Sequence, residues 1–314
     1  MKIIIPQDVT DATLFSSSIP ENDYPAWAMG TTYARGDFVI STATHTVYRS
    51  LTDANTGNDP DLEQVALADP LIDDPDPIRW QIIGATNRWR MFDKKPSVQA
   101  TAADQIEVVI KPLPIVGGIA GFGIEANSVT VTGYSPGVTA EVFNRTIEMR
   151  DESLVVDWYS YYFAPITPLT EFVITDLPPY GDLEVTVTID KPGATVRCGQ
   201  IVIGGLREIG ITKPENTGFT GLDFSYVQQD DFGDLTTVRR AATRLSQFEV
   251  LMANATLLGF DRLMRDLRGG VAAVWIGDGD ARKAAINYGF YRDYRTVYQT
   301  SDHAILSLQI QGIV

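Results

Sequence analysis

The sequence has a single cysteine, two histidines and no long apolar run, and each shortage excludes a class of protein. One cysteine, Cys198, cannot form an internal disulfide or an all-cysteine metal site. The longest apolar runs, such as residues 271–276, fall far short of the roughly 20 residues that a membrane-spanning helix needs. Only three isoleucines separate Lys2 from Pro6, so we expect no signal peptide and infer synthesis and assembly in a cytoplasm.

Basic residues are also scarce. The chain of 314 residues has 25 Lys and Arg against 40 Asp and Glu, which gives a net charge of −15. Nucleic-acid binding requires clustered cations that neutralise phosphates, so we do not expect nucleic acid as the main partner. The negative charge is instead expected to keep an assembly subunit soluble before it docks.

Residues for catalysis are few. Neither His45 nor His303 lies in a recognisable nucleophile motif. The glycine-rich residues 117–123 follow two prolines and do not open a helix, so we interpret them as a flexible linker or turn rather than a phosphate-binding loop. With 40 acidic residues, a pair of carboxylates carries no specific signal. We therefore expect no enzymatic activity and no cofactor.

One segment partly matches the sequence motif of a calcium-binding loop. Residues 53–59 (DANTGND) supply oxygen ligands, yet the glycine comes one place early and the closing glutamate is missing. Turn formation by Asn, Gly, Asp and Pro explains the same residues, so we predict no metal site.

Short strands separated by turns dominate residues 97–205, which favours a β-sandwich. The expected strands are Gln105–Ile110, Ser128–Thr132, Ala140–Arg150, Glu171–Thr175, Leu183–Ile189 and Ala194–Ile203. Strict alternation over 183–189 predicts that Leu183, Val185, Val187 and Ile189 share one buried face. Cys198 lies in the last of these strands, so we expect a buried thiol.

Beyond residue 205 the pattern changes to long, partly exposed hairpin strands over 206–250. Apolar residues near 3.6 spacing predict a helix at 255–267, with Asn254 as its cap and Gly269–Gly270 at its end. Strands are expected again at 271–276 and 305–313. The fold class is therefore mainly β, with a small N-terminal β module, a central β-sandwich and a C-terminal β domain with one helix.

Four segments follow from these patterns: an arm at 1–23, a β module at 24–95, a sandwich at 96–205 and a β-rich domain at 206–314. The arm contains a strand at Lys2–Ile5, which either a neighbouring subunit orders or the chain's own fold takes up as an edge strand. Residues 52–76 are rich in loop signals, including an acidic, proline-punctuated part at 69–76, and are expected to be solvated.

The module carries the most specific motif, W…TTYARGDFVI…TVYRSL…NTGNDP…W, which begins at Trp27. It resembles carbohydrate-binding modules of the chitin-binding type, in which tryptophans open and close a small sheet around a Gly-Asp turn. Joined to the following ATNRWRMFD, it resembles the N-terminal module of minor tail and baseplate proteins of long-tailed bacteriophages. The resemblance covers residues 1 to about 95.

Two interpretations of the module's rings remain open. Sugars stack on flat aromatic rings, so a platform could hold a glycan, with Arg35 or Asp37 bonding its hydroxyls. Its candidate carbohydrate-binding residues are Trp27, Tyr33, Tyr48, Trp80 and Trp89. Alternatively, the same rings form the core of a module too small to have another.

Two further aromatic clusters are expected to alternate between the core and a subunit interface, where aromatic residues are enriched. The first is 158–163 (WYSYYF), and the second comprises Tyr288, Phe290, Tyr291, Tyr294 and Tyr298.

The resemblance implies a structural protein of the virion, such as a distal tail protein or upper baseplate subunit. Copies would form a ring, three-fold or six-fold, that joins the tail tube to the hub and fibre proteins, with residues 206–314 as its belt-like domain. The alternative is a host-surface glycan-binding tail protein that acts through the N-terminal module. A cell-wall hydrolase is a third hypothesis.

Overall fold

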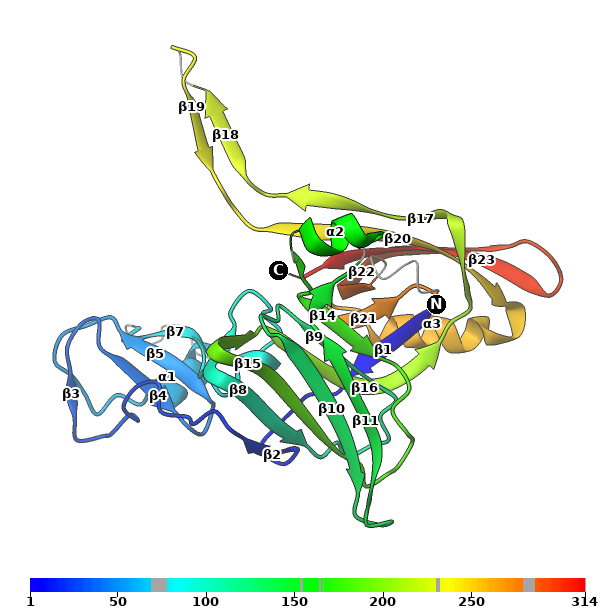
Figure 1. Ribbon diagram of the computed structural model, residues 1–314. Helices are drawn as coiled ribbons and strands as arrows, with labels where there is room; N and C mark the ends of the chain where they lie inside the picture. Colours follow the sequence, from blue (N-terminus) through cyan, green and yellow to red (C-terminus); the bar gives the residue numbers. More distant parts are fainter. Residues whose placement is uncertain are drawn as a thin grey trace.

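The computed structural model describes residues 1–68, 78–152, 155–163, 165, 167–229, 232–278 and 286–313. The fold is mainly β, as the sequence predicts, with large curled antiparallel sheets. Figure 1 shows a small module at one side, a sandwich in the middle, and a long hairpin that extends away from the body. No helix in the described ranges is long and apolar enough to cross a membrane.

The largest sheet has nine strands. In spatial order they are β14 (Glu171–Ile174), β9 (Gly118–Phe122), β16 (Gln200–Glu208), β1 (Lys2–Pro6), β21 (Ala273–Ile276), β22 (Ile286–Tyr298), β23 (His303–Gly312), β20 (Ala242–Ala253) and β17 (Ile211–Asp223). All of its pairings are antiparallel.

The second sheet has five strands, β11 (Ala140–Glu148), β10 (Ser128–Ser135), β15 (Glu184–Cys198), β8 (Ala100–Ile110) and β2 (Leu14–Ser17). The module contains β4 (Phe38–Ser41), β5 (Thr46–Ser50) and β7 (Trp80–Ala85), beside the pair β3 (Thr32–Tyr33) and β6 (Asn55–Thr56). Two further pairs are β12 (Arg150–Asp151) with β13 (Thr167–Pro168), and β18 (Tyr226–Gln229) with β19 (Leu235–Val238). The helices are α1 (Pro60–Ala68), α2 (Trp158–Phe163) and α3 (Leu257–Asp266), with 3-10 turns at Arg90–Phe92 and Asn254–Thr256.

The sandwich forms where the five-stranded sheet packs on β14, β9 and β16. Their facing side chains make one apolar core, which includes Val187 from β15, Ile119 from β9 and Ile203 from β16. The alternation predicted for residues 183–189 is confirmed, because the four apolar side chains are buried while the polar ones between them are partly exposed. Cys198 is buried in the same core, as expected.

The helix predicted at 255–267 is present as a 3-10 turn followed by α3. Phe260 and Met264 pack into a core with Phe248 and Trp275 of the nine-stranded sheet. The expected cap is wrong, because the Asn254 side chain donates to the backbone carbonyls of Thr300 and Ser301 and so ties the helix start to a neighbouring turn.

The expected N-terminal arm is corrected by the structure. β1 lies inside the nine-stranded sheet, paired with β16 on one side and β21 on the other. β2 then joins the five-stranded sheet beside β8. Residues 1–23 are therefore part of both large sheets, and the expected boundary at 205/206 falls inside β16.

The interpretation of residues 117–123 as a flexible linker or turn is also wrong. They form β9, which is buried along its whole length between β14 and β16. An added Cβ at Gly118 would lie 2.8 Å from Ile4 Cδ1, and one at Gly121 would lie 2.4 Å from Phe172 Cε1. The glycines therefore let neighbouring side chains pack directly against the β9 backbone.

Residues 60–68, expected to be loop, form α1. Pro60 occupies the first helical position, and Asp59 Oδ1 accepts a hydrogen bond from the backbone N–H of Asp61 at 2.9 Å. Both features are standard helix-start signals. Glu63 of α1 then accepts from the backbone N–H groups of Arg79 and Trp80, which fixes the helix to β7. The acidic stretch at 69–76 lies outside the described residues.

Two adjacent glycines of β16 differ in how closely the β1 backbone approaches them. A Cβ at Gly204 would lie 1.9 Å from the Ile5 carbonyl oxygen, whereas a Cβ at Gly205 meets nothing within 4 Å. We expect Gly204→Ala to lower the free energy of unfolding by about 1–3 kcal/mol, because the β1 backbone must shift. Gly205→Ala is the matched control and should be neutral. Denaturant unfolding of both variants measures the difference, and equal stabilities would contradict the close pairing of β1.

Candidate functional site

Three of the five candidate carbohydrate-binding rings form the core of the module. Tyr33, Tyr48 and Trp80 are buried together with Val39, and Trp27 packs against them partly buried. Trp80 is only 1% exposed, and the Tyr33 ring meets it edge-on with centroids 5.3 Å apart. These rings therefore do not form an exposed platform for sugar stacking.

The polar atoms of the core rings are satisfied inside the module. Trp80 Nε1 donates to the Asn58 carbonyl at 2.9 Å, and the Tyr48 hydroxyl donates to Asp61 Oδ1 at 2.8 Å. Burial raises the pKa of Tyr48, and the neighbouring Asp61 carboxylate raises it further. Both partners lie at the start of α1 or just before it, so the unpredicted helix completes this core.

Trp89 belongs to a different place. It is buried in the sandwich core, where the module meets the body, and its ring stacks on His45 with centroids 4.1 Å apart. Phe92 meets it edge-on from the following 3-10 turn. The structure thus separates Trp89 from the other four rings, which the sequence placed in one group.

The two residues expected to bond sugar hydroxyls shape a turn instead. Asp37 Oδ2 accepts a hydrogen bond from the backbone N–H of Ala34, and the backbone N–H of Arg35 donates to Asp53. Gly36 between them has a φ of +98°, which favours glycine. The Gly-Asp motif therefore has a local structural role in the turn.

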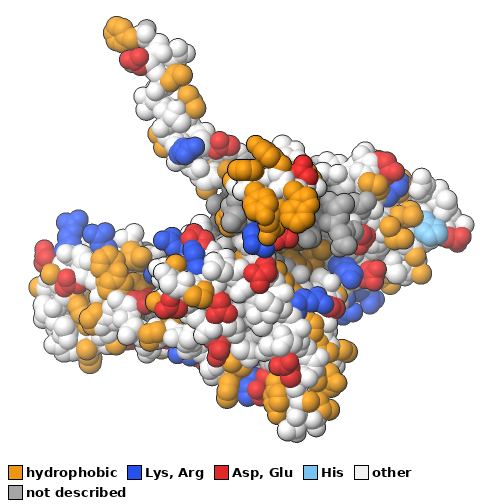
Figure 2. Space-filling model, in the orientation of Figure 1, with side chains coloured by type: hydrophobic (Ala, Val, Ile, Leu, Met, Phe, Trp, Pro, Cys, Tyr) orange, Lys and Arg blue, Asp and Glu red, His pale blue; other side chains and the backbone are white. Residues whose placement is uncertain are grey.

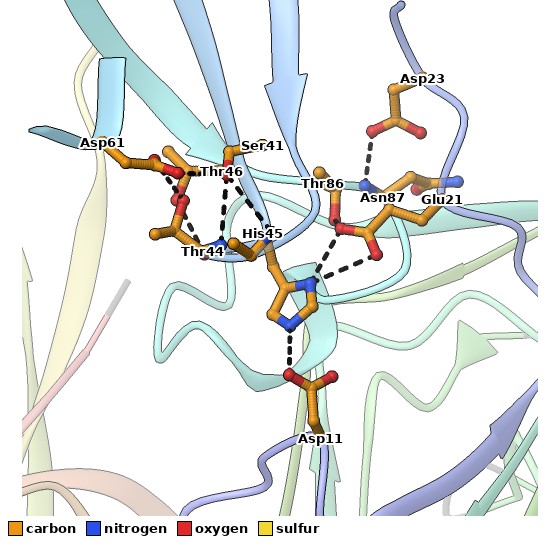
Figure 3. A network of polar contacts seen from close by, with 11 residues as sticks. Asp11, Glu21, Asp23, Ser41, Thr44, His45, Thr46, Asp61, Thr86 and Asn87 are labelled. Carbon is orange, nitrogen blue, oxygen red and sulfur yellow. Dashed lines mark hydrogen bonds and ion pairs between the residues drawn. The ribbon is translucent and has the colours of Figure 1, made fainter. Parts of the chain in front are cut away.

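A polar network ties the module to the N-terminal segment (Figure 3). His45 sits in the turn between β4 and β5, with Nδ1 3.0 Å from Glu21 and Nε2 3.1 Å from Asp11. Glu21 also accepts from the Thr86 hydroxyl, and Asp23 accepts from the backbone N–H of Asn87. Sequence reasoning missed this network, because its bonded pairs are up to 65 positions apart.

The described side chains around His45 include no nucleophile that the imidazole contacts. A groove of about 510 Å³ beside it is lined by Trp89, Asp93 and Lys95, among others. Burial raises the pKa of Asp93, whose Oδ2 has no hydrogen-bond partner within the described part of the chain. No group of three or more His, Cys, Asp or Glu side chains could hold a metal ion among the residues that the structure describes.

The cluster at 158–163 is corrected by the structure. It forms the short helix α2, with no side chain in the core, and is started by Asp157, whose Oδ1 accepts from the backbone N–H of Ser160 at 2.7 Å. These hydrogen bonds lower the pKa of Asp157. None of the helix residues is buried, and its five rings are 64–78% exposed. We refer to β12, α2 and β13, with the other described residues of 150–168, as the aromatic lobe.

The C-terminal aromatic residues are divided between core and surface. Tyr288 is buried and stacks on Phe122, while Tyr291 and Tyr294 are partly buried and donate to the Met264 carbonyl and to Asp261 of α3. Tyr298 at the end of β22 is exposed. Tyr291 and Tyr294 therefore help to attach α3 to the sheet.

The hairpin β18–β19 is the second exposed apolar feature. Its strands pair only with each other, and all eight strand residues are exposed. None of the eight carries a charge, although 21% of the chain is charged. Figure 2 shows hydrophobic side chains along this hairpin and gathered over α2.

The two ends of the nine-stranded sheet meet across a groove of about 420 Å³. Glu171 at the start of β14 lines one side, and Phe219 of β17 and Arg244 of β20 line the other. Burial raises the pKa of Glu171, and the charge of Arg244 opposes this rise. In the described residues, β14 and β17 each pair on one side only. The groove therefore lies between two open sheet edges.

Comparison of the chain with protein-family models, with curated proteins and with solved structures finds no match.

The module core gives a direct test. We expect Trp80→Ala to cost about 3–5 kcal/mol of local stability, because it removes the largest buried side chain of a small core. Hydrogen exchange of the backbone amides in β4 and β5 should accelerate accordingly. Met29→Ala is the control, since this side chain is 72% exposed and should change little. Unchanged exchange in the Trp80 variant would show that the rings do not hold the module together.

Cys198 is predicted to be inert in the native protein. Burial raises the pKa of its thiol to about 12, so at pH 8 it is neither ionised nor accessible to a reagent. A chromogenic disulfide reagent should label no thiol in the folded chain and one thiol per chain after denaturation. Rapid labelling of the folded chain would contradict the burial of this strand.

Proposed function

We propose that this chain is a structural subunit of a long-tailed bacteriophage virion, in the tail tip or baseplate. Copies form a ring that connects the tail tube to the hub and fibre proteins. The observation that carries this proposal is the combination of open sheet ends with exposed apolar side chains on α2 and on the β18–β19 hairpin.

Unprotected strands support an assembly role. Soluble proteins usually protect exposed strand edges with charges, prolines or covering segments. The eight strand positions of β18 and β19 carry no charge or proline, and this two-stranded extension of the β17–β20 pair has no third strand beside it in the described residues. A hairpin of this kind is expected to be covered by another chain, through added strands or packed side chains.

The N-terminal motif supports the location in a phage tail. It resembles the modules of minor tail and baseplate proteins, and its turn and tryptophan positions serve as structural elements in this chain. The module lies at one side of the body, where it could face fibres or the host surface (Figure 1).

The glycan-binding alternative is weakened by burial. It requires rings that can stack on a sugar, yet Tyr33, Tyr48, Trp80 and Trp89 are all buried. Our proposal assigns no chemical reaction to the chain. His45 contacts two carboxylates, and the Cys198 thiol is buried with a raised pKa, so neither is arranged for nucleophilic catalysis.

The proposal is tested by the particle that the purified full-length chain forms. We expect native mass spectrometry to give a closed oligomer, three or six copies being the simplest numbers, and negative-stain electron microscopy to show a ring. The measurement is repeated at low micromolar concentration as a control for non-specific association, because a specific ring should persist there. A stable monomer at all concentrations would overturn the proposal, and an open filament would overturn the ring.

A further inference from the structure

We propose that the hairpin β18–β19 of one copy docks on the aromatic lobe of the next copy, so that the ring is held by a head-to-tail contact. This inference rests on the proposed function, and it names the two surfaces and their partner. The partner of each surface is a second copy of this chain.

Chain connectivity places the two surfaces beside the two end strands of one curled sheet, which face each other across the groove. The aromatic lobe ends at Pro168, three residues before β14 begins at Glu171. The hairpin begins at Tyr226, three residues after β17 ends at Asp223. β14 and β17 are the two end strands of the nine-stranded sheet. A contact between different surfaces of two identical chains is heterologous, and such contacts generate rings when the rotation closes.

A hairpin does not cover the lobe of its own copy. The hairpin extends away from the body (Figure 1), and the rings of α2 keep most of their surface exposed. Each face of the hairpin combines two apolar side chains with two uncharged polar ones: Tyr226 and Val238 lie on one face, and Val227 and Leu235 on the other. Both faces can therefore make apolar contacts with a neighbour without burying a charge.

The exposed area matches what a stable interface needs. Five aromatic rings that are about 70% exposed offer on the order of 700 Å² on the lobe alone. A standard protein interface buries roughly 800 Å² on each partner. The hairpin contributes its own apolar side chains, including Phe232 at the tip, which is 92% exposed.

Charge favours a second copy over a basic partner. Two copies that each carry a net charge of −15 repel one another wherever acidic residues face each other. The strand positions of β18 and β19 and the six residues of α2 contain no acidic side chain, whereas Asp151, Glu152 and Asp157 flank α2 and Asp234 precedes β19. The central contact positions are therefore uncharged, so a second copy can pack on them without bringing like charges together there.

Two double variants of the full-length chain test the contact. The hairpin variant carries Tyr226→Lys and Leu235→Lys, and the lobe variant carries Trp158→Ser and Tyr162→Ser. All four side chains are exposed, so the body should fold normally, which circular dichroism checks. We expect each variant alone to lose the oligomer, with the dissociation constant raised on the order of 100-fold. The control is Leu62→Lys with Val65→Lys on α1, an equal charge change at equally exposed apolar positions, which should assemble as the unsubstituted chain does.

Mixing decides whether the contact is head-to-tail. An equimolar mixture of the two variants retains one intact hairpin and one intact lobe, so native mass spectrometry should detect a heterodimer that grows no further. Variants that assemble normally, or a mixture of folded variants that stays monomeric, would overturn the inference and leave the ring proposal standing. If the unsubstituted chain forms filaments and the mixed variants still form the heterodimer, the head-to-tail contact is supported and the ring is overturned.

Discussion

The pairing of β1 between β16 and β21 is the constraint on which the rest of the structure depends. The nine-stranded sheet is built from two parts of the chain, residues 118–208 and 211–312, and β1 joins them. Ile3 packs into the core beneath α3, and Ile4 packs into the core beside Tyr288. Burial of each isoleucine contributes roughly 1.5–3 kcal/mol to stability. The five residues of β1 therefore hold the sandwich and the layer that contains α3 together.

This connection produces a wide, curled sheet with two open ends. The curl brings β14 and β17 to opposite sides of one groove without pairing them. Each end strand leads into an exposed apolar feature: the aromatic lobe beside β14 and the hairpin beyond β17. The same architecture that completes the core within one copy therefore leaves single-sided strand edges and exposed apolar side chains at the two ends, where the proposed contacts between copies would form.

The sequence predicted correctly those features that depend on residues near one another along the chain. The alternation at 183–189, the apolar spacing of α3 and the burial of Cys198 depend on neighbours along the chain. The position of β1 depends on partners in β16 and β21 that lie about 200 or more residues away, which no local pattern encodes. The glycines of β9 suggested flexibility, although their role is to admit Ile4 and Phe172. The sequence signals for the start of α1, Asp59 followed by Pro60, were present and could have predicted the helix. The identity of an aromatic residue, in contrast, does not tell whether its ring is buried in a core or exposed for binding.

The burial of those rings decides how the module behaves in an assembly. A three-stranded sheet of this size has little core of its own, so it uses Tyr48 and Trp80 inside. It then depends on Trp89, stacked on His45, and on the contacts of His45 with Glu21 and Asp11 for its attachment to the body. Asp11 lies between β1 and β2, and Glu21 follows β2, so the N-terminal segment that supplies β1 to the large sheet also anchors the module. The module is therefore held at a fixed position relative to the sheet, and a ring of these chains would present its modules at regular positions.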